Sequence, residues 1–183
     1  MDDSKHLESI PPVTIDDVTG NASLSTKEHV ALWLHRFCWE GRFGTRTAKS
    51  LKLVEVSILP KIDEPKRQEA RIILETTVKE DMLNLAGNVH GACITYLVDI
   101  CSTLPIMALS HAQGGEGLPG VSQHIDIIFH APASLGDKLK LITTTITVGG
   151  RTASSRIDLW DATHHRLIAS GTQIKMEASQ SKL

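Results

Sequence analysis

The residues whose types and spacing could carry out chemistry lie between positions 84 and 99. A polar loop leads into a long apolar segment through the sequence Asn84-Leu85-Ala86-Gly87-Asn88-Val89-His90-Gly91-Ala92. The first backbone N–H groups of a helix have no partner within the helix and carry partial positive charge, so they can stabilise an oxyanion. Gly91 would present its N–H without a side chain in the way. Such a loop is also typical of an ordinary helix start, so both interpretations stay open.

Asp99 is the second residue with chemical potential, because it lies between Val98 and Ile100 inside the apolar segment. An ionised carboxylate is costly there unless it is paired or used. One hypothesis is a catalytic base or nucleophile. The other is a carboxylate that faces a polar seam or hydrogen-bonds a neighbour, and the pattern alone favours neither.

The spacing of Gly91 and Asp99 has a consequence for assembly. They are eight residues apart, which is about 12 Å along one helix and too far to act on a single carbonyl carbon. Two chains packed with these helices antiparallel would bring Gly91 of one beside Asp99 of the other. If the site exists, we expect a homodimer, or a tetramer built from such dimers.

The elements that must position these residues follow from the apolar pattern. Strand-like segments at Leu51–Leu59 and Glu69–Val78 predict a hairpin, and Gly91–Ser110 is apolar all round, which predicts a buried helix. Pro105 should kink this helix or end its regular part. Four further strands are expected at Val121–Ala131, Lys138–Val148, Thr152–Trp160 and Leu167–Met176. This order predicts an α+β fold, with an antiparallel sheet around one central helix.

The N-terminal part predicts an arm and one more helix. Residues 1–24 have no apolar period and should form a flexible arm. Ser25 and Glu28 have the spacing of a capping box, and apolar residues then recur at helical intervals, namely Val30, Trp33, Leu34, Phe37 and Cys38. We therefore expect a domain over residues 25–177 and a polar tail over 178–183.

Composition excludes several function classes. Of 183 residues, 41% are hydrophobic, and 19 Lys plus Arg face 21 Asp plus Glu without a basic block. A nucleic-acid partner is therefore not expected. The sequence contains no run of about 18 apolar residues that would predict a membrane span, and the start MDDSKHLESI lacks the features of a signal peptide. These features favour an intracellular protein.

Three cysteines, Cys38, Cys93 and Cys101, show no spacing typical of a zinc site, and we expect all three to be reduced. Cys93 lies one turn from His90 and imitates a Cys-His pair, but its apolar surroundings favour packing. The chain ends in Ser181-Lys182-Leu183, the form of a peroxisomal address read by an import receptor, which predicts a peroxisomal location unless the tripeptide is a coincidence.

The chain from about residue 50 to 176 resembles the hotdog-fold acyl-CoA thioesterases of the phenylacetate-degradation and thioesterase-superfamily-member-2 type. Short motifs in family order carry the resemblance. They are Asn84, His90-Gly91, Leu97-Val98-Asp99, Ser102-Thr103, Pro119-Gly120-Val121-Ser122, Phe129-His130-Ala131-Pro132-Ala133, Gly136-Asp137, Gly150-Arg151-Thr152 and Leu167-Ile168-Ala169-Ser170-Gly171. The resemblance implies a hotdog fold and hydrolysis of an acyl-CoA to free acid and coenzyme A.

The resemblance also implies residue roles. Asp99 would act as base or nucleophile, Gly91 would polarise the thioester carbonyl, and Asn84 and Ser122 would position water and substrate. His90 would organise the loop through hydrogen bonds, with a direct role in proton transfer as the alternative. Apart from the resemblance, Arg151 is a weaker candidate for contact with the phosphates of coenzyme A, since an exposed arginine after two glycines is usually part of a solvated turn. No metal or redox cofactor is expected, and coenzyme A enters as part of the substrate.

The chain departs from the family pattern at two places, and both concern acyl preference. Ala92 stands where the family usually has a second glycine, which would narrow the approach to the oxyanion site. The loop Gln113–Leu118 is longer than usual and would change what reaches Ser122.

Other functions remain as alternatives. The period-two set Ser122, His124, Asp126 and His130 would share a strand face and imitate a metal site, although a polar strand edge explains it equally. A serine hydrolase would need a G-x-S-x-G elbow, which the sequence lacks. A hotdog enoyl-thioester hydratase or dehydratase and a non-catalytic acyl-binding module are the remaining rivals.

Overall fold

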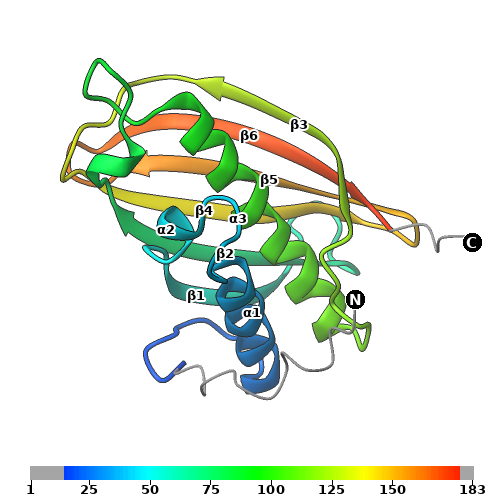
Figure 1. Ribbon diagram of the computed structural model, residues 1–183. Helices are drawn as coiled ribbons and strands as arrows, with labels where there is room; N and C mark the ends of the chain where they lie inside the picture. Colours follow the sequence, from blue (N-terminus) through cyan, green and yellow to red (C-terminus); the bar gives the residue numbers. More distant parts are fainter. Residues whose placement is uncertain (1–14, 178–183) are drawn as a thin grey trace, which may run out of the picture.

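The computed structural model describes residues 15–177, in which one long helix lies across a curved antiparallel sheet (Figure 1). Six strands form the sheet in the order β1-β2-β4-β5-β6-β3, so β1 and β3 are its two edges. The strands are β1 (Lys52–Pro60), β2 (Gln68–Thr77), β3 (Val121–Phe129), β4 (Lys138–Val148), β5 (Thr152–Asp161) and β6 (Arg166–Met176). The predicted hairpin and the four later strands are confirmed, and so is the α+β hotdog fold.

The central helix α3 (Gly91–Ala112) is buried against the sheet as its composition predicts. Its apolar side chains, Leu97, Leu104 and Met107 among them, are fully buried. It continues through Pro105 to Ala112, so the predicted end of the regular helix at this proline is wrong. In the described part, α3 is the one helix long and apolar enough to cross a membrane, but 72% of that apolar window is buried inside the fold. Its role as the core helix accounts for its composition.

The N-terminal helix α1 (Leu24–Phe37) packs on α3. Its cap is Ser23, whose Oγ accepts a hydrogen bond from the backbone N–H of Thr26 at 3.3 Å, so the predicted capping box at Ser25 and Glu28 is wrong. Two short helices, α2 (Thr45–Ala48) and η2 (Glu80–Met82), connect α1 to β1 and β2 to α3.

Residues 15–23 differ from the arm predicted for residues 1–24. Thr19 forms a parallel bridge with Glu55 of β1, and Ile15 and Ala22 belong to the hydrophobic core. The folded part therefore includes residues 15–23, because their backbone pairs with β1 and two of their apolar side chains are buried. The rest of the arm, and the tail with Ser181-Lys182-Leu183, lie outside the described residues.

The turn between β5 and β6 is held by a fully buried carboxylate, Asp161. It accepts hydrogen bonds from the backbone N–H groups of Thr163 and His164 at 2.9 and 3.1 Å, from His164 Nδ1 at 2.8 Å and from Arg166 Nε at 3.2 Å. Burial by itself would raise the pKa of Asp161, but the hydrogen bonds from His164 and Thr163 outweigh it and hold the pKa below its ordinary value.

We expect Asp161→Asn to lower the free energy of unfolding at pH 7 by about 2 kcal/mol, because charge-assisted hydrogen bonds are lost. Since the pKa is lower in the folded protein, the unfolded chain binds the proton first as pH falls. The stabilisation by Asp161 is therefore present above its ordinary pKa of about 3.9 and is lost below it. Urea unfolding of both proteins between pH 7 and pH 2 should show their difference shrinking below pH 4. A difference that stays constant with pH would contradict this role.

Candidate active site

Helix α3 begins at Gly91, and its N-terminus is capped at one backbone N–H group while another has no partner in the described part of the chain. The preceding residue, His90, is the N-cap, and its Nδ1 accepts a hydrogen bond from the backbone N–H of Ala92 at 3.0 Å. An accepting Nδ1 leaves the ring proton on Nε2, so His90 organises the helix start. Among the residues that the structure describes, none accepts a hydrogen bond from the Gly91 N–H. This donor is available to a bound oxyanion.

The loop before α3 is closed by Asn84. Its Oδ1 accepts hydrogen bonds from the backbone N–H groups of Ala86 at 2.9 Å and Asn88 at 3.2 Å. Gly87 has a φ of +77°, a conformation that glycine adopts without strain and that closes this turn. The loop is tied down further where His90 donates its backbone N–H to Met82. Asn84 therefore shapes the loop that carries the open helix start.

Asp99 lies half-buried in α3, and side chains of the sheet donate hydrogen bonds to its carboxylate. Its Oδ1 accepts hydrogen bonds from Ser122 Oγ at 2.7 Å and from Gln173 Nε2 at 2.5 Å. The structure thus brings together Asp99 and Ser122, two of the residues singled out in the sequence. A carboxylate with a hydroxyl beside it can orient a water molecule and remove its proton.

A β-bulge turns Ser122 toward α3. The pairing of β3 with β6 places Ser122 opposite Lys175 but His124 opposite Ile174, which is one residue out of step. Facing residues in an antiparallel pair lie on the same side of the sheet, so Ser122 shares the inner face with Lys175 while His124 faces away. The predicted common face of Ser122, His124, Asp126 and His130 is therefore wrong, and with it the alternative of a metal site there.

Two residues next to Asp99 were not singled out in the sequence, namely Gln173 and Lys175 of β6. Both are buried, while Ile174 and Met176 between and beyond them are exposed, the reverse of the usual alternation. The sequence does contain a signal, because alternate residues of a strand lie on the same face of the sheet. Gln173 and Lys175 therefore share a face with two small residues, Ala169 and Gly171. Gly171 approaches Val98 of α3, so this is the face against the helix.

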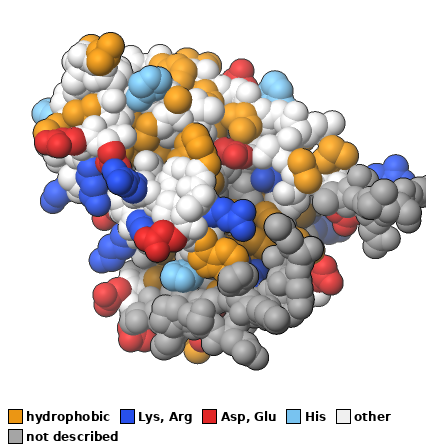
Figure 2. Space-filling view, in the orientation of Figure 1, with side chains coloured by type: hydrophobic (Ala, Val, Ile, Leu, Met, Phe, Trp, Pro, Cys, Tyr) orange, Lys and Arg blue, Asp and Glu red, His pale blue; other side chains and the backbone are white. Residues whose placement is uncertain are grey.

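The two halves of the site are apart in one chain. Gly91 and Asp99 stand two turns apart on α3, about 12 Å along the helix axis. A side chain on Gly91 would first meet the ring of Phe129, at 3.6 Å, at the end of edge strand β3. Val121, Ile128 and Phe129 of this strand are all more than half exposed. Hydrophobic side chains gather at the upper left of Figure 2, where Figure 1 places the start of α3 and the end of β3.

A large open cavity lies beside the Asp99 side of the site. It measures about 1110 Å³ and is lined by Ile106 of α3, Leu118, the β4–β5 turn with Arg151, and Lys175. Lys175 also donates a hydrogen bond to Ser122, the hydroxyl that contacts Asp99. Lys175 thus links the wall of the cavity to Ser122 and Asp99, and Arg151 is exposed along the cavity.

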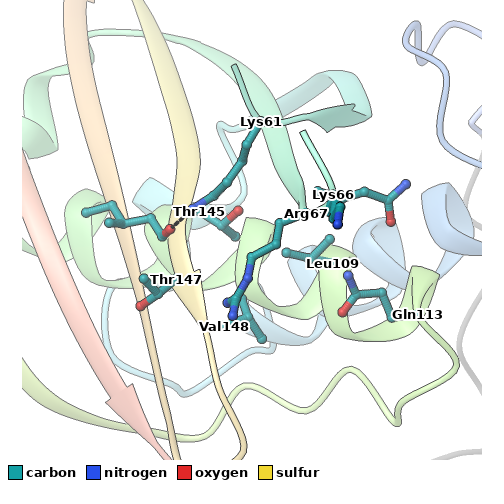
Figure 3. A pocket seen from close by; sticks show the side chains of 10 residues that line it. Lys61, Lys66, Arg67, Leu109, Gln113, Thr145, Thr147 and Val148 are labelled. Atoms are coloured by element: carbon teal, nitrogen blue, oxygen red, sulfur yellow. Dashed lines mark hydrogen bonds between the residues drawn. The ribbon is translucent and has the colours of Figure 1, made fainter. Parts of the chain in front are cut away.

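A second, smaller cavity of about 270 Å³ lies at the far end of α3. Figure 3 shows Lys61, Lys66 and Arg67 around it, with Leu109 and Gln113 of α3. Lys61 donates to the backbone oxygen of Ile146 at 2.7 Å, and both Lys61 and Arg67 form ion pairs with Glu64. The carbonyl end of α3 also disfavours a bound anion there.

Comparison with known proteins matches residues 86–168 to the model of the thioesterase superfamily. The mouse protein named acyl-coenzyme A thioesterase 13 is 30% identical over 118 residues, which cover 64% of this chain and 81% of that protein. The chain belongs to the thioesterase superfamily. The family predicted from the sequence motifs is confirmed.

Solved structures of this superfamily share the fold. Zebrafish thioesterase superfamily member 2 aligns with a TM-score of 0.67 at 24% identity, covering 85% of this chain and all of that one. The mouse protein of the same name aligns with a TM-score of 0.65 at 26% identity, covering 85% and 99%. The hotdog architecture of this superfamily member is therefore that of its relatives over most of the chain.

The two places where the sequence is expected to depart from the family pattern lie at the ends of α3. Ala92 is exposed directly after Gly91, where its methyl group borders the open helix start. The loop Gln113–Leu118 is anchored to α1, because the ring of His29 contacts the carbonyl oxygen of Gly117 through Nε2 at 2.9 Å. Residues 115–118 of this loop form part of the wall of the large cavity.

The remaining reactive groups of this superfamily member are engaged in packing and turns. Burial raises the pKa of the Cys93 thiol, against a smaller opposing hydrogen bond with Thr47, so the thiolate of a Cys-His pair is disfavoured. In the described part of the chain, Asp137, Asp161 and His164 alone form a group with metal-binding spacing. Their hydrogen bonds already close the turns in which they lie.

Proposed function

We propose that the chain is an acyl-CoA thioesterase, which hydrolyses an acyl-CoA to the free acid and coenzyme A. The observation that carries the proposal is the Asp99 carboxylate, held by Ser122 beside a large cavity. The mouse and human relatives named acyl-coenzyme A thioesterase 13 support the substrate class. Membership of the thioesterase superfamily supports the reaction.

The active form in this proposal is a homodimer built on β3. An edge strand presents unpaired backbone groups, and its exposed Val121, Ile128 and Phe129 would be covered by a second copy. Twofold pairing of two β3 edges sets the α3 helices side by side and antiparallel. Gly91 of one chain then lies near Asp99 of its partner, which makes two equivalent sites.

The chemistry follows from the two groups. The thioester carbonyl oxygen accepts a hydrogen bond from the Gly91 N–H, and Asp99 of the other chain, whose carboxylate Ser122 holds, removes a proton from a water molecule. The water oxygen adds to the carbonyl carbon, and the oxyanion is stabilised at the helix N-terminus. Its collapse breaks the carbon–sulfur bond. A thiol pKa of about 8.5 makes the thiolate a good leaving group without a strong general acid.

In the same proposal, different residues of the large cavity contact different parts of the substrate. Ile106 and Leu118 offer apolar surface to an acyl or pantetheine chain, while the exposed Arg151 is suited to a phosphate of coenzyme A. Asn84 holds the loop at the carbonyl end of the substrate. No metal takes part in any step.

The test is thiol release from a panel of acyl-CoA esters of graded length, with enoyl-CoA as the alternative substrate. We expect free coenzyme A from saturated acyl-CoA and no hydrated product from enoyl-CoA. Hydration without thiol release would favour a hydratase, and binding without turnover would favour an acyl-binding module. A single turnover in ¹⁸O-labelled water tests whether Asp99 is a nucleophile. Label in the Asp99 carboxylate identifies a nucleophile whose anhydride was opened at the aspartyl carbon, because a base can place the label only in the product acid.

A further inference from the structure

The geometry points to Gln173 and Lys175 as positioning residues, which orient the Asp99 carboxylate and the Ser122 hydroxyl for catalysis. This inference rests on the proposed function and goes beyond it, since both residues are assigned an effect through Asp99 and Ser122 and not on the substrate itself. Both come from β6, more than 70 residues from Asp99 in the chain. Their contacts form one connected network.

Gln173 is fully buried, and all of its hydrogen-bonding capacity is used. Its Nε2 donates to Asp99 Oδ1 at 2.5 Å and to Ser122 Oγ at 3.0 Å. Its Oε1 accepts from Ser102 Oγ at 2.6 Å and Thr103 Oγ1 at 3.2 Å. An ionised carboxylate only accepts hydrogen bonds, so the amide group that faces it must be the NH₂ group. The two hydroxyls on α3 thus keep the amide aimed at Asp99.

Lys175 brings a positive charge to the same hydroxyl. Lys175 is only 7% exposed, and its Nζ donates to Thr103 Oγ1 at 3.0 Å and to Ser122 Oγ at 3.2 Å. Ser122 accepts these bonds from Lys175 and Gln173, so its own proton is directed to Asp99. Both bonds to the carboxylate end on Oδ1, and no described residue occupies Oδ2. Oδ2 is the oxygen left for the attacking water.

A buried ammonium is costly, which argues for a functional reason to keep it. Burial lowers the pKa of Lys175, and the nearby Asp99 carboxylate partly opposes this shift. The other charged groups along the adjoining cavity are Glu116, Arg151 and Glu177. An apolar side chain of similar length would remove the desolvation cost without changing the packing volume much. The lysine is therefore expected to contribute to catalysis at some expense of stability.

The main test compares Lys175→Met with Lys175→Arg in the full-length protein. We expect Lys175→Met to lower kcat by about 10- to 100-fold, because misaligned reacting groups lose much of their advantage. KM should change little and the midpoint of thermal unfolding should stay the same or rise. Lys175→Arg keeps the charge and should retain most of the activity. Lys52→Met, on edge strand β1 and exposed, is the matched control.

The pH profile gives a readout that a structural role would not move. The wild-type kcat should fall at alkaline pH as Lys175 loses its proton, with a midpoint below the ordinary lysine pKa of about 10.4. Lys175→Arg should lose this fall, since a guanidinium stays protonated. An unchanged kcat in Lys175→Met, or a loss that follows the fraction of unfolded protein, would overturn the inference.

Gln173→Leu provides a second variant of similar volume. It removes the donor to Asp99. The single hydroxyl protons of Ser102 and Thr103, which Gln173 Oε1 accepts in the wild type, can turn to the backbone oxygens of Val98 and Asp99 in their own helix. We expect a fall in kcat of the same order as in Lys175→Met and a far smaller change in KM. A kcat equal to that of the wild type would overturn the role of Gln173. If the wild type itself releases no thiol from acyl-CoA, the proposed function fails instead, so the two failures are distinguishable.

Discussion

Asp99→Asn is expected to lower kcat for acyl-CoA hydrolysis by about 1,000-fold, the effect typical of removing a positioned base. Asparagine keeps the shape of the side chain and an oxygen that can accept the bonds from Ser122 and Gln173. It cannot take a proton from water. The expected loss is therefore one of chemistry, with the fold preserved.

Thiol release and calorimetric binding of coenzyme A measure the two sides of this prediction. Binding should stay within a few-fold of the wild type while turnover collapses. Asp63→Asn, in the exposed connection between β1 and β2, is the control and should change neither. Turnover by Asp99→Asn within five-fold of the wild type would remove Asp99 from the mechanism.

Gly91→Pro is expected to lower kcat by about 100- to 1,000-fold, as the loss of one oxyanion donor does in other acyl-transfer sites. Proline deletes the N–H at this position and nothing else that the helix uses, because Gly91 is the first residue of α3. Proline is favoured at the first position of a helix. His90 has φ of −65° and ψ of 135°, a conformation that suits a residue before proline.

Gly91→Ala is the matched control for this substitution. It keeps the N–H, and its Cβ would meet Phe129 at 3.6 Å, an ordinary van der Waals contact. Its activity should stay within a few-fold of the wild type, and thermal unfolding should be similar in all three proteins. Equal losses in Gly91→Ala and Gly91→Pro would assign the effect to crowding and contradict a role for the N–H.

The parts of the site that lie close together along the chain were predictable. Gly91 and Asp99 share one apolar helix, and a glycine at its start and a carboxylate in its interior are visible as exceptions to the pattern. Ser122 entered through the family motif. The structure adds the hydrogen bond between Ser122 and Asp99, which neither position predicts alone.

Gln173 and Lys175 were not found, because their inward direction depends on strand register. Period-two alternation in β6 would put Ile174 and Met176 inside by hydrophobicity, whereas the small Ala169 and Gly171 set the opposite face against α3. The bulge beyond Ser122 is likewise a property of the pairing of two strands. The hydrophobic periodicity of one β-strand predicts neither the inward direction of Gln173 and Lys175 nor the position of the bulge.

The fold was predicted well in its long elements and less well at its ends. The core helix and the strands follow from apolar periodicity over 9 to 22 residues. The helix cap at Ser23 and the packing of residues 15–23 on β1 depend on single hydrogen bonds and on a distant strand. Pro105 does not end α3, which continues to Ala112 with the neighbouring side chains of Leu104 and Ile106 buried.

The central claim, a site shared between two chains, is tested most directly with a heterodimer purified through two different tags. One subunit carries Asp99→Asn and the other Gly91→Pro, so one of the two shared sites stays intact. We predict about half of the wild-type turnover per dimer, although each variant alone is nearly inactive. A wild-type subunit paired with one that carries both substitutions should be nearly inactive. Activity in that second heterodimer, with none in the first, would contradict the shared site.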